Sequence, residues 1–175
     1  VIGYDEPLSR PLNLTMERGQ KIAMVGANGI GKTTLLKSIM GYIEPISGKS
    51  ILGDYLYPGY FEQEKKYETN ITCIDELWSE FPSFTQYEVR SALAKCGLMT
   101  KHIESLMKVL SGGEQAKVRL CKLINRASNL LVLDEPTNGL DEDSCDIVVN
   151  FLLAYVAAGK TVLMSTHHQD LMRRL

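Results

Sequence analysis

The sequence predicts a single α/β domain, in which a mainly parallel sheet is flanked by helices and carries a small β subdomain and a small helical lobe. Three observations predict it. Short apolar runs alternate along the chain with stretches of helical periodicity. A glycine-rich stretch at 26–31 separates an apolar run from a helix, and the apolar run 130–133 suits a strand buried on both faces. With 175 residues, 45% of them hydrophobic, the chain is long enough for one core of this kind.

The first part, residues 1–69, is expected to contain the β subdomain and the start of the core. Extended residues at 11–16, a turn, and the apolar run 21–25 predict two paired strands. After the glycines, apolar residues recur at helical spacing from 32 to 40, so the order here is strand, loop and helix. Between 43 and 61, glycine and proline divide the chain into short β-prone pieces.

The remaining residues are expected to form a helical lobe and then the rest of the core. We assign residues 70–110 to the lobe, because 74–78 and 87–93 have the apolar periodicity of amphipathic helices. Residues 111–175 then alternate between helix and strand. Helices are expected at 111–126 and 141–157, and strands at 130–134 and 161–165.

Composition limits the classes of partner and compartment. The net charge of −2 provides no global basic field, so no direct nucleic-acid site is evident. The four cysteines lie more than twenty positions apart, which favours free thiols over a disulfide or a zinc site. No apolar run approaches the roughly 18 to 20 residues of a membrane span, and the first residues do not resemble a signal peptide. We therefore expect a cytoplasmic domain.

Residues 26–33 form the most specific motif of the chain. They read Gly-Ala-Asn-Gly-Ile-Gly-Lys-Thr and fit G-x-x-x-x-G-K-S/T at every fixed position, between a strand and a helix. Such a loop turns its backbone N–H groups toward phosphate oxygens, while Lys32 reaches the β- and γ-phosphates and Thr33 offers a hydroxyl to Mg²⁺. The motif predicts a nucleotide-binding P-loop fold, with contacts from Asn28, Gly29, Ile30, Gly31, Lys32, Thr33 and Thr34.

Two carboxylates follow the apolar run 130–133, at the strand end where ligands gather in open α/β sheets. Asp134 is predicted to hold Mg²⁺ through water, opposite Thr33. Glu135 is predicted to orient and polarise the attacking water, because phosphoryl transfer depends on positioning and charge stabilisation. The alternative is a solvated acidic turn that caps the next helix.

The order of motifs resembles the ABC ATPase superfamily. Leu110-Ser111-Gly112-Gly113-Glu114 lies between the phosphate loop and Asp134-Glu135-Pro136-Thr137, and the resemblance covers nearly the whole chain. It implies a P-loop NTPase with a RecA-like core and an ATPase activity that uses ATP and Mg²⁺. It also implies that Ser111, Gly112, Gly113 and Glu114 contact the nucleotide of a second ABC domain, in a head-to-tail dimer or a tandem copy.

Further positions match the family residue by residue. Tyr4 matches the aromatic that stacks on adenine, the alternative being an ordinary surface or core tyrosine. Gln63 matches the glutamine that touches Mg²⁺ and the attacking water, and it could equally be one more polar loop residue. His167 matches the γ-phosphate sensor, with a slip to His168 as the alternative. Gly139-Leu140-Asp141 matches a dimer-contacting loop, although Asp141 could also serve as a helix N-cap.

The two parts of the chain resemble different branches of that superfamily. The N-terminal two-thirds, with Asn28 to Thr33 and the stretch 60–64, resembles the ABC-F branch, whose members act on the ribosome where their role is known. The C-terminal part, with Gly139 in place of that branch's histidine and the run 161–167, resembles ATPase subunits of bacterial transporters. A divergent natural member, a fragment and a chimera all fit this mixture. The domain is expected to be shortened at both ends.

Two functional hypotheses follow. In the first, the chain is a Mg-ATP hydrolase that couples turnover to a partner, either a ribosome or a membrane permease. In the second, it is a nucleotide-binding or structural domain with little turnover, because it is shortened or chimeric. GTPases are disfavoured, because the Ser111–Glu114 loop has no role in them. The sequence does not identify the transported substrate or the biological process.

Overall fold

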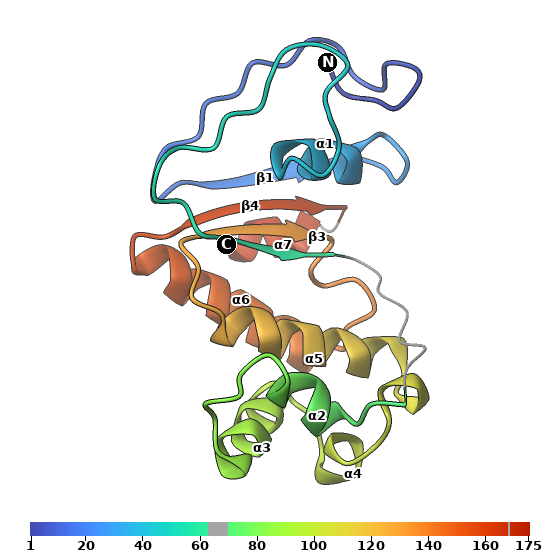
Figure 1. The fold of residues 1–175 in the computed structure, drawn as a ribbon. Helices are drawn as coiled ribbons and strands as arrows, with labels where there is room; N and C mark the ends of the chain where they lie inside the picture. Colours follow the sequence, from blue (N-terminus) through green and yellow to red (C-terminus); the bar gives the residue numbers. More distant parts are fainter. Residues whose placement is uncertain (63–69, 168) are drawn as a thin grey trace. The chain divides into compact units, whose positions relative to one another are not determined.

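The computed structural model describes residues 1–62, 70–167 and 169–175. The chain divides into two compact units (Figure 1). The first unit contains residues 1–62, 127–136 and 152–175, and the second contains 63–126 and 137–151. Helix α6 (Glu142–Ala157) contributes its start to the second unit and its end to the first.

A four-stranded sheet organises the first unit, in the spatial order β1-β4-β3-β2. All three strand pairs are parallel, as Figure 1 shows. Parallel pairing brings the carboxyl ends of neighbouring strands to the same edge of the sheet. The strands are β1 (Lys21–Val25), β2 (Pro58–Phe61), β3 (Leu130–Asp134) and β4 (Thr161–Thr166).

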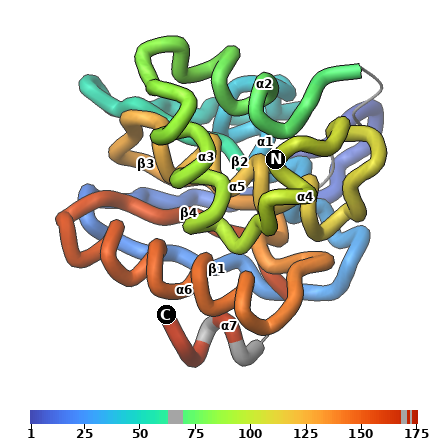
Figure 2. The backbone as a smooth tube through the Cα atoms, turned by 90° about the horizontal axis from the view of Figure 1, so that it is seen from below, coloured from blue at the N-terminus to red at the C-terminus, as the bar shows by residue number. Residues whose placement is uncertain are grey.

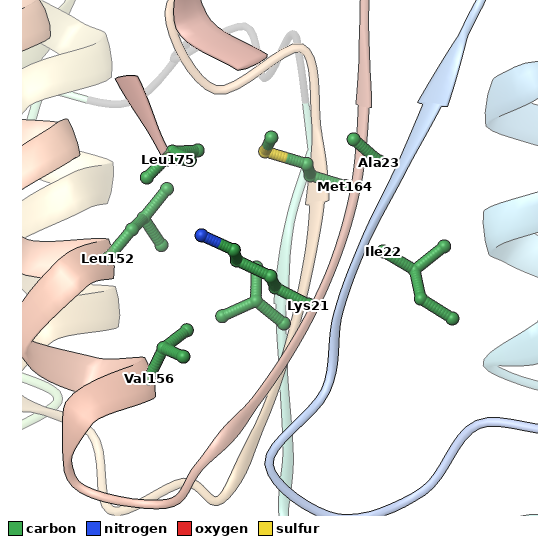
Figure 3. A pocket seen from close by; sticks show the side chains of 8 residues that line it. Lys21, Ile22, Ala23, Leu152, Val156, Met164 and Leu175 are labelled. Carbon is green, nitrogen blue, oxygen red and sulfur yellow. The ribbon is translucent and has the colours of Figure 1, made fainter. Parts of the chain in front are cut away.

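The strands predicted at 130–134 and 161–165 are confirmed, and both are buried along their whole length. Helix α1 (Lys32–Ile39), also predicted, packs Leu36 against Val132 and Leu163 on one face of the sheet. On the opposite face, a cavity of about 250 Å³ lies between the strands and the end of α6. Figure 3 shows Leu152 of α6 facing Lys21 and Met164 across this cavity. A short helix, α7 (Gln169–Arg174), follows β4.

The strand pair expected at 11–16 and 21–25 is not formed. Residues 11–20 contain no strand, and β1 pairs in parallel with β4 instead. The reason lies in burial: Leu12 and Leu14 are about half exposed, whereas β1 gains a partner that is buried on both faces. Residues 43–57 also contain no strand, so among the described residues of 1–62 the strands β1 and β2 both belong to the core sheet.

The second unit is helical, as predicted for the lobe and the following helix. Figure 2 shows its helices. Their apolar core includes Leu77, Leu93 and Val118, all fully buried. Side-chain caps begin the longer helices: Thr85 caps α3 and Ser111 caps α5. The helices before α6 are α2 (Cys73–Trp78), α3 (Gln86–Lys95), α4 (Thr100–Ile103) and α5 (Gly112–Asn125), with a 3₁₀ turn at Met107–Val109.

The cysteines are free thiols, and Cys73, Cys96 and Cys121 are buried in the core of the second unit. Burial raises the pKa of Cys73 to about 12, so this thiol stays protonated and acts as a small apolar side chain. Within the part of the chain that the structure describes, no helix combines the length and apolar character that crossing a membrane requires.

Candidate nucleotide site

The glycine-rich loop connects β1 to α1 in the first unit. Gly29 and Gly31 have φ angles of 84° and 94°, in the left-handed region that side-chain-bearing residues avoid. Gly31 precedes the first turn of α1 and supplies no side-chain cap. A Cβ atom added to Gly29 would meet no atom within 4 Å, so the space above the loop is open. The loop therefore presents the uncapped start of a helix to any anion that enters.

Lys32 is the first residue of α1, and its side chain turns back onto this loop. Its Nζ donates hydrogen bonds to the carbonyl oxygens of Gly26, at 2.7 Å, and of Ala27, at 3.1 Å. The same Nζ lies 3.2 Å from Oε1 of Glu135, and the two side chains are only 9% and 3% exposed. The predicted phosphate-binding lysine and the predicted water-orienting carboxylate thus form a buried ion pair.

His167 completes this cluster from the end of β4. Its Nδ1 lies 2.8 Å from Oε2 of Glu135, and its backbone N–H donates to the same oxygen at 3.2 Å. Burial by itself raises the pKa of Glu135, but the Lys32 ammonium and the two His167 contacts outweigh it and lower the pKa below its ordinary value. Because an ionised carboxylate only accepts, Nδ1 of His167 is the donor in this contact.

Only one of the two carboxylate oxygens of Asp134 accepts a hydrogen bond from the described residues. Oδ1 accepts a hydrogen bond from the Ser165 hydroxyl at 2.6 Å. Oδ2 is buried and has no hydrogen-bond partner among the described residues. Thr33 lies in the first turn of α1, directly after Lys32. An open carboxylate oxygen and a threonine hydroxyl fit the oxygen ligands that Mg²⁺ prefers.

Tyr4 lies in a tight turn that packs on the phosphate loop. Gly3 pairs with Pro7, and Leu8 N–H donates to the Ile2 carbonyl at 2.9 Å. The same turn reaches Gly31, because a Cβ atom there would lie 3.6 Å from Cβ of Leu8. The Tyr4 side chain is 65% exposed. It lines a hollow of about 480 Å³ together with Lys37, Tyr42, Ile43, Tyr60 and Glu62.

The Ser111 loop belongs to the second unit. Ser111 is exposed, and its hydroxyl accepts from the backbone N–H of Glu114, while Glu114 accepts from Ser111 N–H in return. Gly112 has open space around it, whereas a Cβ atom on Gly113 would lie 2.7 Å from the Gly139 carbonyl oxygen. The loop is therefore an ordered helix start with an exposed face.

Asp141 caps the start of α6 in the second unit, because its carboxylate accepts from the Ser144 N–H at 2.9 Å. This confirms the N-cap interpretation of Asp141.

The other predicted positions have different outcomes. Gln63 and the alternative His168 lie outside the described residues. Asn28 and Ile30 are exposed, and Thr34 is buried. Ser165 was not predicted, because its place beside Asp134 depends on the register between β3 and β4, which local sequence patterns do not show.

A family model described as ABC transporter matches residues 9–138. The uncharacterized ABC transporter ATP-binding protein YfmM of Bacillus subtilis is 65% identical over 97% of this chain and 32% of its own length. ABC transporter F family member 2 of Arabidopsis thaliana is 35% identical over 100% of this chain and 26% of its own length. The chain thus spans about a third or less of these curated relatives.

The dimeric ATP-binding cassette MJ0796, with ADP and Pi bound, superposes with a TM-score of 0.78 over 95% of this chain and 83% of its own. At 20% identity it shows the shared fold alone. Both curated relatives align along nearly the whole of this chain. The chain belongs to the ABC transporter family and is an ATPase domain with the P-loop α/β fold.

Proposed function

We propose that the chain hydrolyses Mg-ATP at composite sites formed by two ABC domains in a head-to-tail arrangement, and couples turnover to a partner. The observation that carries this proposal is the buried ion pair of Lys32 and Glu135, joined by His167, beside an open glycine-rich loop. Buried charges are costly unless they are paired, so their concentration at one strand edge indicates a site built for chemistry on a charged ligand.

The phosphates would bind the N–H groups of the loop and the start of α1. Lys32 would exchange its contact with Glu135 for the β- and γ-phosphates, because a phosphate oxygen is the more highly charged acceptor. Asp134 and Thr33 would hold Mg²⁺, and Gln63 is proposed as a further ligand. When bound, the metal ion neutralises charge on the phosphates and makes ADP a better leaving group.

Glu135 would hold the water that attacks the γ-phosphorus. The new bond joins water oxygen to phosphorus, the bond from the γ-phosphorus to the oxygen that bridges it to the β-phosphorus breaks, and the water proton passes to Glu135 or phosphate. His167 keeps one carboxylate oxygen fixed through two contacts, so the other can turn to the water once Lys32 leaves it. Tyr4 would stack on the adenine from its turn beside the loop.

Ser111 would act on the nucleotide of the second domain. Its hydroxyl already accepts from Glu114 N–H, so the hydroxyl proton can be donated to a phosphate oxygen. Open space at Gly112 permits close approach of that phosphate to the start of α5. The composite site thus pairs the first unit of one copy with the second unit of another.

Mixing two inactive variants tests this arrangement. Glu135→Gln and Ser111→Ala, which remove a carboxylate and a hydroxyl without adding bulk, should each lose ATP turnover by about 100-fold or more. In a mixed dimer, however, one site combines the normal Glu135 of one copy with the normal Ser111 of the other. The account predicts that mixing restores turnover, to roughly a quarter of the normal rate at equal amounts, because about half of random dimers are mixed and each has one intact site.

No recovery on mixing, with both variants folded and binding ATP, would contradict the composite site. ATP binding with no turnover that depends on Glu135 would instead support a nucleotide-binding domain. For the coupled partner, the ribosome and a membrane permease are the two proposed classes, and co-sedimentation of the full chain with ribosomes or with membranes distinguishes them.

A further inference from the structure

One buried hydroxyl connects the two carboxylate residues of the site. Ser165 lies opposite Asp134 in the register of β3 and β4 and is fully buried. Its Oγ donates to Oδ1 of Asp134 at 2.6 Å and accepts from the backbone N–H of Glu135 at 3.1 Å. The Ser165 carbonyl oxygen accepts from the same N–H at 3.2 Å. Ser165 therefore contacts both residues at the end of β3.

The direction of these bonds follows from chemistry. A serine hydroxyl has one proton, and an ionised carboxylate only accepts, so the proton lies toward Asp134. The remaining lone pairs of Oγ then face the Glu135 N–H. Because Oδ1 is engaged by Ser165, Oδ2 is left as the Asp134 oxygen that is open to a cation.

The backbone of Glu135 needs such an anchor. Its φ angle of 47° lies in the left-handed region, which is strained for a residue with a side chain and persists only where the surroundings fix it. Both acceptors of the Glu135 N–H belong to Ser165. The conformation directs the Glu135 carboxylate to Lys32 and His167.

We propose that Ser165 is a positioning residue, whose hydroxyl orients the Asp134 carboxylate toward Mg²⁺ and holds Glu135 in its left-handed conformation. The inference rests on the proposed Mg-ATP function and adds a residue that acts through two others. A merely structural serine would contribute to stability and leave the affinity for the metal ion unchanged. Ser128 is such a serine in the same unit: it is buried, and its hydroxyl lies 2.9 Å from the hydroxyl of Tyr155, a neutral partner.

The test uses Mn²⁺ in place of Mg²⁺, because bound and free Mn²⁺ are counted by electron paramagnetic resonance. The full chain is titrated with Mn²⁺ in the presence of an ATP analogue whose β–γ bridge is not cleaved. Ser165→Ala should weaken Mn²⁺ binding by about 10- to 100-fold, the range for residues that orient a metal ligand. Ser128→Ala should leave it within about twofold. Affinity for a fluorescent ATP without metal should change less than about threefold in both variants.

A matched pair of variants separates the hydroxyl from side-chain volume. Ser165→Thr and Ser165→Val have the same shape, and only the threonine keeps the hydroxyl. We expect the threonine variant to bind Mn²⁺ about tenfold or more tightly than the valine variant. Equal Mn²⁺ affinities of these two variants, or of Ser165→Ala and the unaltered chain, would overturn the inference while leaving the proposed function intact. If the unaltered chain has no Mn²⁺ site that depends on nucleotide, the proposed function fails together with the inference.

Discussion

The two units differ in what they bury. In the first, the residues Asp134 and Glu135 are 1% and 4% exposed, and their carboxylates contact Lys32, His167 and Ser165. In the second, the core is apolar, and the helices α3 and α5 begin at ordinary side-chain caps. The feature there that the proposed function uses is an exposed helix start at Ser111. The first unit thus concentrates charge and backbone strain, whereas the second supplies a stable support for one loop.

Because of this difference, substitutions in the two units should affect different quantities: ligand affinity in the first unit and stability in the second. Changes at the strand edge of the first unit should alter nucleotide or metal binding more than stability, because the buried groups there are paired with one another. Changes in the core of the second unit should do the reverse.

The largest effect is expected from Lys32→Ala. Removing a buried ammonium from its anionic partner costs about 2 to 5 kcal/mol, so ATP affinity should fall by about 30-fold or more. Fluorescence titration with a labelled ATP measures it, and Lys49→Ala on the exposed surface is the control. An affinity within about threefold of the unaltered chain would show that Lys32 does not contact phosphate.

Leu93→Ala should mainly affect stability. Leu93 is fully buried in the core of the second unit, and removing its side chain should lower the free energy of unfolding by about 2 to 5 kcal/mol. Urea unfolding measures this, with the partly exposed Leu153→Ala as the comparison. While the variant remains folded, its ATP affinity should stay within about twofold. A large loss of affinity in the folded protein would break the comparison between the units.

Tyr4→Ala should weaken ATP binding by about 1 to 3 kcal/mol, the range for an aromatic ring that stacks on a base. Stability should change by about 0.5 kcal/mol or less, because the side chain is 65% exposed. Tyr4→Trp should retain binding, since it also offers a ring. Tyr55→Ala, at a residue that is 85% exposed, is the control. Unchanged affinity for ATP in Tyr4→Ala would remove Tyr4 from the site.

The smallest effect is expected at Asp141. Loss of a helix cap costs about 1 kcal/mol, so Asp141→Ala should lower stability by this amount at pH 7, and Asp143→Ala in the same turn should not. Bonds from Ser144 and Lys117 lower the pKa of Asp141 to about 2, from 3.8. A lowered pKa stabilises the fold above pH 3.8, and the stabilisation is lost as the pH falls toward 2.

The cost of Asp141→Ala should therefore shrink between about pH 4 and pH 2, where the carboxylate of the unaltered chain becomes protonated in the folded state. Urea unfolding of both chains at a series of pH values measures this trend. A cost that stays constant, or grows, toward acidic pH would contradict the charge-based cap.

The sequence predicted the parts that local rules govern. The motif at 26–33 located the loop, the run 130–133 located a buried strand, and the helices α1, α3, α5 and α6 followed from periodicity. The strand predicted at 21–25 is confirmed, but its predicted pairing with a strand at 11–16 is wrong, because β1 instead joins a partner that lies about 140 residues later in the chain. Local patterns do not encode such long-range pairing. The same limit explains why Ser165 was not predicted, because its role depends on its register with Asp134.

The solution mass of the Glu135→Gln variant tests the central claim most directly. When hydrolysis is blocked, Mg-ATP should hold two domains together at their composite sites. Light scattering should then show the mass doubling with Mg-ATP and remaining single without it. Adding Lys32→Ala or Ser111→Arg should abolish the doubling. A variant that binds Mg-ATP and stays a monomer at the same concentration would contradict the composite site.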